Sequence, residues 1–264
     1  MRKKLLVLSL LCVAMVASVA TVARAEIKKV EVDYKDGDVT LKGFIAYDEA
    51  VEGKRPGVII IHEWWGHNDY VRGRAEQLAR LGYVAFAVDM YGDGKKTEDP
   101  KQAGEWAGQF YTDRALAISR INAALNTLKQ NERVDGEKIA AIGYCFGGSM
   151  SLEAARAGLD LRGVVSFHGG LKTPAPAKAS DLKAKILVLH GADDPLVPND
   201  EVEAFMKEMR DANADYTFVA YGNAVHGFTN PGADARNMPP LKYNAKADLR
   251  SWEAMKSFLV EVFQ

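Results

Sequence analysis

The sequence predicts an α/β fold, with a mostly parallel central sheet and helices on both of its faces. Short and strongly apolar runs, such as 58–61 and 83–88, have the length and composition of buried strands. Segments that we interpret as helices alternate with these strands along the chain. This alternation is typical of a parallel sheet covered on both faces. We find no internal repeat and no long linker, so residues 26–264 are predicted to form a single domain.

The N-terminus has the features of a secretory signal peptide. Arg2, Lys3 and Lys4 are basic, residues 5–22 are apolar, and Ala23-Arg24-Ala25 matches the A-x-A cleavage pattern. The alternative is a retained membrane anchor. We expect cleavage after Ala25, a periplasmic or secreted mature protein, and no association with the membrane after cleavage.

The charge and the cysteine content limit the partners of the mature chain. Removal of residues 1–25 takes away four basic residues and no acid, so the formal net charge falls from −1 to −5. A negative net charge disfavours binding to nucleic acid or to an anionic membrane. Cys145 is then the one remaining cysteine, and an odd cysteine in an exported protein indicates a reactive thiol. We expect a small-molecule partner, and the oligomeric state stays open.

The elements follow one another from the N-terminus in a regular series. The first two strands are joined by an Asp-Gly-Asp turn at 36–38, and glycine and proline separate several of the later elements. Residues 171–184 are predicted to be a surface connection, and Gly104 and Gly108 are weak points in one long helix. The predicted strands are 30–34, 39–47, 58–61, 83–88, 139–142, 163–167, 185–189 and 216–221, and the predicted helices are 70–81, 101–130, 149–157, 200–213 and 245–260.

The segment 138–150 contains the strongest indication of chemistry. A buried strand is followed by Gly143, Cys145 and Gly147 in a G-x-C-x-G pattern, and then by a helix. This order resembles the nucleophile elbow of α/β-hydrolases, with cysteine in the position of serine. Glycines are needed where the backbone turns sharply, and a cysteine at a helix N-terminus is favoured as a thiolate. The alternative is a buried structural cysteine on a glycine turn.

A thiol nucleophile requires a base and a group that orients the base. His226 lies in a loop after the last predicted strand, and Asp194 follows the preceding strand. The order Cys145, Asp194, His226 is the nucleophile, acid, histidine order of α/β-hydrolases. Asp193 is the competing acid. Alternatively, both aspartates bond to their own backbone in a turn.

The loop after the strand 58–61 carries further candidates. The backbone N–H groups of Phe146 and Trp64 are the predicted oxyanion donors. Glu63 is a carboxylate in an aromatic neighbourhood, with a solvated loop acid as the alternative, and His62 is predicted to be structural. The remaining histidines lack an acid-rich cluster of metal-ligand spacing, so we predict no metal and interpret them as structural or pocket-lining. They are His67, His168 and His190.

Four motifs together resemble the dienelactone hydrolase family of α/β-hydrolases, over essentially all of the mature chain. They are Glu63-Trp64-Trp65-Gly66, Gly143-Tyr144-Cys145-Phe146-Gly147-Gly148, Asp194-Pro195-Leu196-Val197-Pro198 and His226-Gly227-Phe228. The resemblance implies the α/β-hydrolase fold and a Cys-His-Asp triad that hydrolyses lactones or esters without a cofactor. It also implies that Glu63 contacts the resting thiol and controls its ionisation.

The resemblance also suggests where substrate would bind. Well-known members hold a substrate carboxylate with arginines, one of them four residues after the catalytic histidine, where this chain has Asn230. Arg114 is a candidate for another, and Trp65 and Tyr144 are candidate pocket residues. Because Asn230 is neutral, the dienelactone substrate itself is not implied. The alternatives are a carboxylesterase or acyltransferase that acts on another ester, and a non-catalytic small-molecule-binding relative.

Overall fold

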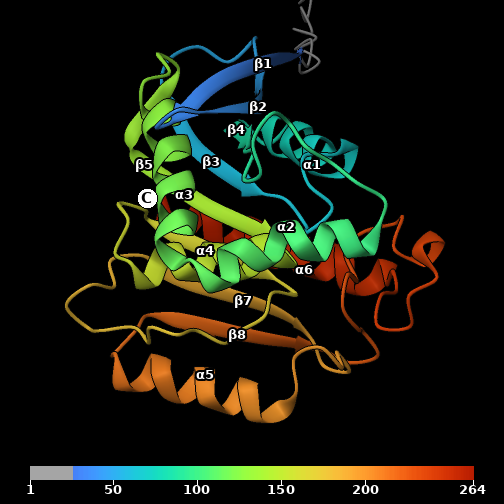
Figure 1. The fold of residues 1–264 in the computed structure, drawn as a ribbon. Helices are drawn as coiled ribbons and strands as arrows, with labels where there is room; N and C mark the ends of the chain where they lie inside the picture. Colours follow the sequence, from blue (N-terminus) through green and yellow to red (C-terminus); the bar gives the residue numbers. More distant parts are fainter. Residues whose placement is uncertain (1–25) are drawn as a thin grey trace, which may run out of the picture.

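The computed structural model describes residues 26–264, in which eight strands form one sheet with the spatial order β1-β2-β4-β3-β5-β6-β7-β8 (Figure 1). Apolar β-branched residues dominate the central strands, which are buried on both faces. The strands are β1 (Ile27–Asp36), β2 (Val39–Asp48), β3 (Arg55–Ile61), β4 (Val84–Ala87), β5 (Val134–Tyr144), β6 (Gly163–Phe167), β7 (Lys185–Gly191) and β8 (Tyr216–Tyr221).

The sheet is parallel except at one side. β1 and β2 form an antiparallel hairpin, and β2 also pairs antiparallel with β4. The strands from β4 through β3 and β5 to β8 are all parallel. Their carboxyl ends therefore meet at one edge of the sheet, which is where open α/β sheets bind ligands.

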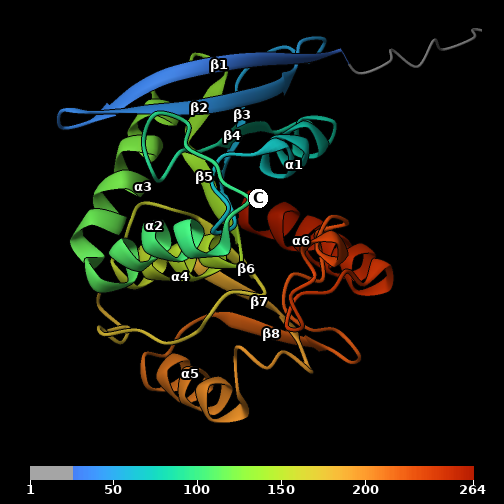
Figure 2. The ribbon, with the colours of Figure 1, turned by 45° about the vertical axis from the view of Figure 1, so that its right-hand side comes forward.

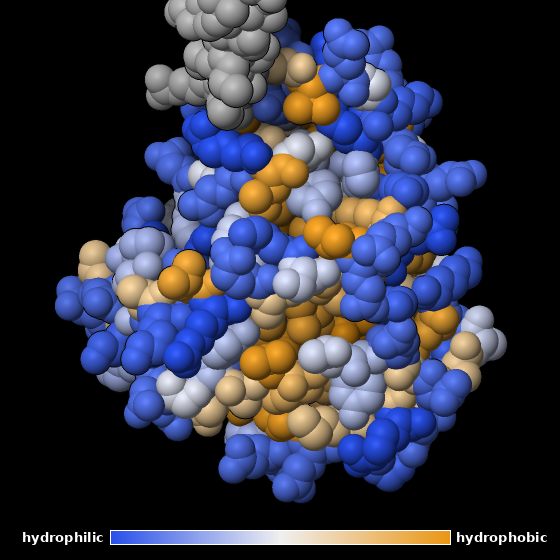
Figure 3. Space-filling view, turned by 180° about the vertical axis from the view of Figure 1, so that it is seen from behind, coloured by the Kyte–Doolittle hydropathy of each residue, from blue (hydrophilic) through white to orange (hydrophobic). Residues whose placement is uncertain are grey.

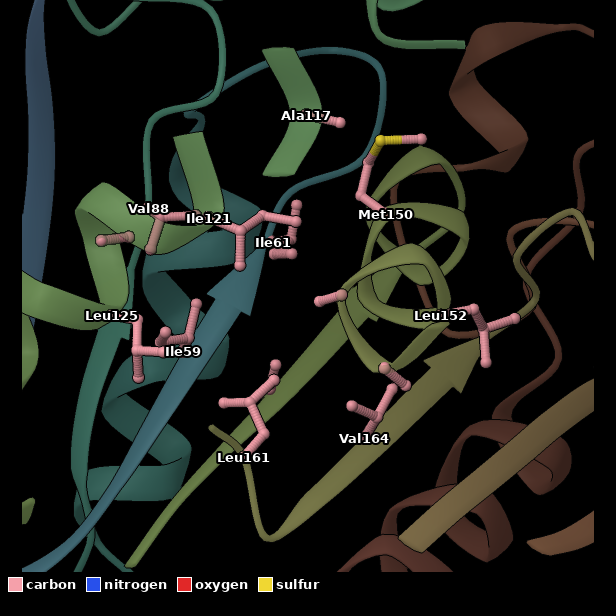
Figure 4. Close-up of a cluster of buried hydrophobic side chains, with 14 of the residues drawn as sticks. Ile59, Ile61, Val88, Ala117, Ile121, Leu125, Met150, Leu152, Leu161 and Val164 are labelled. Carbon is pink, nitrogen blue, oxygen red and sulfur yellow. The ribbon is translucent and has the colours of Figure 1, made fainter. Parts of the chain in front are cut away.

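Helices cover both faces of the sheet, as the turned view shows (Figure 2). α1 (Asp69–Ala79) and α6 (Ala245–Val262) pack on one face. The other face is covered by α2 (Pro100–Thr112), α3 (Arg114–Lys129), α4 (Phe146–Arg156) and α5 (Asn199–Asp211). Figure 4 shows part of the core on this second face, where Ile59 and Ile61 of β3 lie between α3 and α4. This packing holds α4, and with it the predicted elbow, against the middle of the sheet.

The observed elements agree with the predicted ones to within three residues, with two exceptions. β5 begins at Val134, whereas the sequence predicts a strand that begins at residue 139. The predicted helix 101–130 is two helices, which meet at Asp113. Asp113 has φ −118° and ψ 88°, and its side chain accepts a hydrogen bond from the backbone N–H of Leu116 at 3.0 Å, so it caps α3. Gly104 and Gly108, which we expected to be the weak points, lie inside α2.

Viewed from the side of α1 and α6, the surface carries apolar residues in its middle and polar residues around them (Figure 3). Leu249 and Val260 of α6 are among the exposed large apolar side chains. Within residues 26–264, no helix is long and apolar enough to cross a membrane. The predicted signal peptide lies outside the described residues.

Candidate active site

Cys145 lies between the end of β5 and the start of α4, in a strained backbone conformation. Its φ is +55° and its ψ is −117°, a combination that non-glycine residues rarely adopt. Two hydrogen bonds hold the turn, because the Cys145 N–H donates both to Phe167 O at 3.0 Å and to His168 Nδ1 at 3.1 Å. The strain places the side chain at the carboxyl edge of the sheet, as the G-x-C-x-G pattern predicts.

The glycines of the elbow are required by close backbone contacts. A Cβ atom at Gly143 would lie 1.9 Å from Gly147 O, and one at Gly147 would lie 2.2 Å from Ile61 O. Neither position can hold a side chain without moving backbone atoms. The second contact also brings the end of β3, and the loop that follows it, against the elbow.

Cys145, His226 and Asp194 form a connected chain of side chains. The distance from His226 Nε2 to Cys145 Sγ is 3.0 Å, and the distance from His226 Nδ1 to Asp194 Oδ2 is 2.8 Å. Both distances are within hydrogen-bond reach. His226 and Asp194 are buried, whereas Cys145 is partly exposed. The three side chains that the sequence predicts to be nucleophile, base and acid are therefore in contact.

The structure also distinguishes the two candidate acids. Asp194 Oδ1 accepts from the N–H of Leu196 at 2.9 Å, which leaves Oδ2 for His226. Asp193 is exposed, and its backbone N–H bonds to Ala224 O. Asp194 therefore bonds to the backbone of its own turn, as the alternative interpretation expected, and it also contacts His226.

The neighbours of His226 determine its pKa. Burial alone lowers the pKa of His226, but the adjacent Cys145 sulfur and Asp194 carboxylate outweigh burial and raise the pKa to about 10. A positive charge on the imidazole is therefore stabilised by the two groups that it touches. The arrangement favours a charged imidazole beside the sulfur.

Two residues at this site have backbone N–H groups without an acceptor within the described part of the chain. One is Phe146, the first residue of α4, and the other is Trp64, in the loop after β3. Phe146 and Trp64 both line the cavity that contains Cys145. This is the environment expected of oxyanion donors.

The cavity over Cys145 has a volume of about 360 Å³ and is mainly apolar. The titratable side chains in its lining are those of Cys145, Tyr111 and His226. The lining includes no arginine, lysine, aspartate or glutamate. An apolar lining of this kind suits an uncharged substrate. The lining residues are Trp64, Ala107, Tyr111, Cys145, Phe146, Gly170, Leu196, Val197, His226, Met238, Pro240 and Leu241.

Glu63 is buried close to the triad, but its partner is not the sulfur. Its Oε2 accepts from Asn230 Nδ2 at 2.6 Å, and no hydrogen bond joins Glu63 to Cys145 in residues 26–264. The expected contact with the resting thiol is therefore replaced by one with the amide. Burial is the largest influence on Glu63 and raises its pKa, while the hydrogen bond from Asn230 lowers it. Because Glu63 is buried, the alternative interpretation as a solvated loop acid is wrong.

None of the four predicted pocket residues lines the cavity. Asn230 is bonded to Glu63, and the other three make contacts elsewhere. Tyr144 is fully buried and stacks on Phe167, with ring centroids 4.6 Å apart. Side chains alternate between the faces of a strand, so the residue before Cys145 points to the face covered by α1 and α6. Trp65 is buried beneath the guanidinium of Arg236, which lies 4.1 Å from the ring centroid.

Arg114 is the third of these residues. It begins α3, and its Nε donates to Glu153 Oε2 of α4 at 2.5 Å. Because the guanidinium of Arg114 is paired with Glu153, it is not available to bind a substrate carboxylate. Arg114 is therefore not a carboxylate clamp in this structure.

The other histidines are buried, and none lines the cavity. His67 Nε2 lies 3.1 Å from Ala87 O, and His190 packs against Phe218. Burial lowers the pKa of His62, His67, His168 and His190. These four histidines are therefore buried structural residues and do not line the cavity. The described residues contain no group of three or more potential metal ligands.

The sequence did not reveal a polar network behind His226. Thr229 Oγ1 lies 2.7 Å from both His168 Nε2 and Tyr70 OH. Arg74 donates to Thr229 O at 2.7 Å and to Asp248 at 2.6 Å. This network anchors the loop that carries the triad histidine to α1 and α6. No motif marks it, because its members are far apart in the chain.

Comparisons with known proteins identify the family of the chain. The profile of the dienelactone hydrolase family matches residues 41–263. The chain belongs to the dienelactone hydrolase family. Members of this family hydrolyse ester and lactone bonds, and the α/β-hydrolase fold expected from the sequence is the fold observed.

Two solved structures and one curated protein illustrate the relationship. The dienelactone hydrolase-like promiscuous phosphotriesterase P91, from metagenomic libraries, is 41% identical, covers 91% of this chain and 100% of its own, and has a TM-score of 0.87. A structure titled m3DLH is 42% identical over 90% of this chain and 99% of its own, with a TM-score of 0.86. A Yersinia pestis protein named as a carboxymethylenebutenolidase is 27% identical over 84% of each chain.

Proposed function

We propose that this dienelactone hydrolase-family protein is an exported hydrolase of lactones or carboxylic esters, with Cys145 as its nucleophile. The observation that carries the proposal is the 3.0 Å distance between Cys145 Sγ and His226 Nε2, together with the 2.8 Å contact of the same imidazole with Asp194. A thiol is a strong nucleophile once it is ionised, and this arrangement stabilises its thiolate.

In the acylation step, Cys145 Sγ attacks the substrate carbonyl carbon while His226 Nε2 holds the thiol proton. The carbon–sulfur bond forms, and the carbonyl electron pair moves to oxygen, which the N–H groups of Phe146 and Trp64 stabilise. When the tetrahedral intermediate collapses, the carbon–oxygen bond to the leaving group breaks. His226 gives its proton to the leaving alkoxide, and a thioester remains on Cys145.

In the deacylation step, neutral His226 removes a proton from water, and the hydroxide attacks the thioester carbonyl. The same two N–H groups stabilise the new oxyanion. Collapse breaks the carbon–sulfur bond and releases the acid, and the sulfur regains its place beside the imidazolium. Asp194 holds the imidazole orientation throughout. An acyltransferase would differ only in using an alcohol in place of water.

The cavity favours an uncharged acyl group. Its apolar lining contains no arginine or lysine, Arg114 is paired with Glu153, and Asn230 is engaged by Glu63. Burying an unpaired substrate carboxylate against such a lining would be costly. Neutral lactones and esters are therefore the substrates that this site supports best.

A chromogenic ester tests the proposal. The wild-type protein should hydrolyse 4-nitrophenyl acetate, and mass spectrometry of the quenched reaction should find an acetyl group on Cys145. Cys145→Ala should neither hydrolyse the ester nor acquire the acetyl group. Hydrolysis by Cys145→Ala at the wild-type rate would refute the thiol mechanism, and partition of the acyl group to added alcohol would indicate an acyltransferase.

A second candidate activity is the hydrolysis of neutral phosphotriesters. It rests on the likeness to P91, whose title describes a promiscuous phosphotriesterase, and on the uncharged lining of the cavity. A neutral phosphotriester, like a neutral ester, presents an oxygen that becomes negatively charged during attack. Assay of diethyl 4-nitrophenyl phosphate beside the carboxylic ester would compare the two activities in the same preparation.

We further propose that the protein acts outside the cytoplasm, as the basic, apolar and A-x-A features of residues 1–25 suggest. Cleavage after Ala25 would release a chain with one cysteine, which is Cys145. A thiol in such a compartment is open to oxidation, and oxidation follows thiolate character and exposure. Cys145 is partly exposed and lines an apolar cavity, so this proposal predicts that its thiol is sensitive to oxidants.

A further inference from the structure

The peptide group between Glu63 and Trp64 is held by side-chain and backbone hydrogen bonds. Glu63 O accepts from His62 Nδ1 at 2.6 Å and from the Gly66 N–H at 3.1 Å. In a trans peptide the C=O and N–H bonds point in opposite directions, so fixing the carbonyl of Glu63 also fixes the direction of the Trp64 N–H. That N–H is one of the two proposed oxyanion donors.

The protonation of His62 is settled by its neighbours. The Met90 N–H donates to His62 Nε2 at 3.3 Å, so Nε2 has to be an acceptor. The ring is fully buried, and burial lowers its pKa to about 4, so the neutral form is present at neutral pH. The single ring proton is therefore on Nδ1, where it is donated to Glu63 O.

His62 also touches the residue that carries the other donor. Its ring stacks on Phe146, with centroids 5.9 Å apart and an interplanar angle of 25°. Tyr91 packs edge-on against the same ring at 4.8 Å, and its hydroxyl donates to Trp64 O at 3.0 Å. One imidazole thus contacts the peptide of the first oxyanion donor and the side chain of the second.

We propose that His62 is a positioning residue, which aims the Trp64 N–H at the oxyanion through its hydrogen bond to Glu63 O. This inference rests on the proposed ester hydrolysis at Cys145. The Met90 N–H, the imidazole and the Glu63–Trp64 peptide form a chain of hydrogen-bonded dipoles that ends at the oxyanion. Each hydrogen bond in such a chain polarises the next, so His62 also strengthens the N–H as a donor.

Two substitutions separate the hydrogen bond from the bulk of the ring. Asparagine can place its amide N–H near the position of Nδ1, so His62→Asn should keep the donor to Glu63 O. Glutamine can place its oxygen near Nε2, so His62→Gln should keep the acceptor for Met90 but lose the donor. We expect kcat for a neutral ester to fall on the order of tenfold to a hundredfold in His62→Gln, with little change in KM. His62→Asn should retain much more of the activity.

A thionoester of the same acid and alcohol gives a readout that a merely structural role would not move. Sulfur accepts hydrogen bonds more weakly than oxygen, so the thionoester gains less from the oxyanion donors. The ratio of kcat for the ester to kcat for the thionoester should therefore fall in His62→Gln. The rate of alkylation of Cys145 by iodoacetamide, which needs no oxyanion donor, should stay at the wild-type value.

The matched control is His67→Gln. His67 lies on the same loop and is also buried, but it bonds to Ala87 O and does not touch the Glu63–Trp64 peptide. It should leave the ratio unchanged. If His62→Gln does not fold, His62→Phe takes its place, because phenylalanine keeps the stacking on Phe146 and lacks the donor.

A ratio at the wild-type value in the folded His62→Gln or His62→Phe protein would overturn the proposal, as would equal losses in His62→Asn and His62→Gln. Failure of the proposed function has a different signature, since it would appear as ester hydrolysis that persists in Cys145→Ala.

Discussion

Asn230 donates a hydrogen bond from Nδ2 to Oε2 of Glu63 at 2.6 Å, and so joins the loop after β8 to the loop after β3. Both side chains are buried. The first loop carries His226 and the second carries Trp64, so this one contact connects the proposed base to a proposed oxyanion donor. It also places a buried carboxylate close to His226, and the cost of burying this carboxylate is only partly offset by the hydrogen bond from Asn230.

Replacement of Glu63 by glutamine should stabilise the protein at neutral pH. Burial raises the pKa of the Glu63 carboxyl above its ordinary value of 4.5, so the folded state binds the proton more tightly than the unfolded state. The favourable contribution of this group is complete below pH 4.5 and is lost as pH rises through the folded pKa. Thermal melts should show a higher Tm for Glu63→Gln at pH 7 and no difference at pH 4. A lower Tm at pH 7 would contradict this account.

The same substitution should affect the thiol. A nearby negative charge disfavours a thiolate, so its removal should speed the alkylation of Cys145 by iodoacetamide near neutral pH. Ester turnover should fall, because the charge no longer supports the imidazolium of His226. Alkylation and turnover that both equal the wild-type values would show that the carboxylate plays no part in either.

The charge at position 230 should influence substrate choice. The wild-type protein should favour neutral esters over carboxylate-bearing lactones in kcat/KM. Asn230→Arg should raise the relative kcat/KM for the anionic lactone by about tenfold, since a charge-assisted hydrogen bond contributes about 1.5 kcal/mol or more. Asn230→Gln is the neutral control and should not change the preference. A wild-type protein that already prefers anionic lactones strongly would contradict the prediction.

Substitutions in the triad should show losses that do not add. Cys145→Ala should lower kcat on the order of 10⁶-fold, and the double variant with His226→Ala should lose little more, because both residues serve one step. Asp194→Asn should cost less, on the order of 10⁴-fold, through the orientation and charge of His226. Asp193→Asn is the matched control, since its side chain is exposed. Loss in Asp193→Asn with normal activity in Asp194→Asn would reassign the acid.

Export should remove the first 25 residues. The intact mass of the protein recovered from the periplasm or medium should correspond to a chain that begins at Glu26. Substitution of Ala25 by a bulky residue should slow cleavage, because the site requires small side chains. A recovered mass that includes Met1–Ala25 would contradict the prediction.

Local patterns were sufficient to predict the fold class, the elbow and the order of the triad. Apolar runs of strand length depend on nearby residues alone, and the G-x-C-x-G pattern can be recognised locally. The contact that requires Gly147 is with Ile61 O of β3, which is distant in the chain. The break at Asp113 escaped prediction, because the segment 101–130 has helical composition on both sides of it. The side chain of Asp113 caps the start of α3, and the strength of such a cap depends on its local geometry.

The sequence by itself determined that Cys145, Asp194 and His226 would follow strands whose carboxyl ends meet at one edge, since parallel strands impose that arrangement. Only the tertiary structure decided which neighbours each side chain would find. It joined Glu63 to Asn230 and Arg114 to Glu153, and it packed His62 against Phe146. The physical reason is that such contacts form between residues distant in the chain, and their partners are set by packing and burial rather than by local pattern.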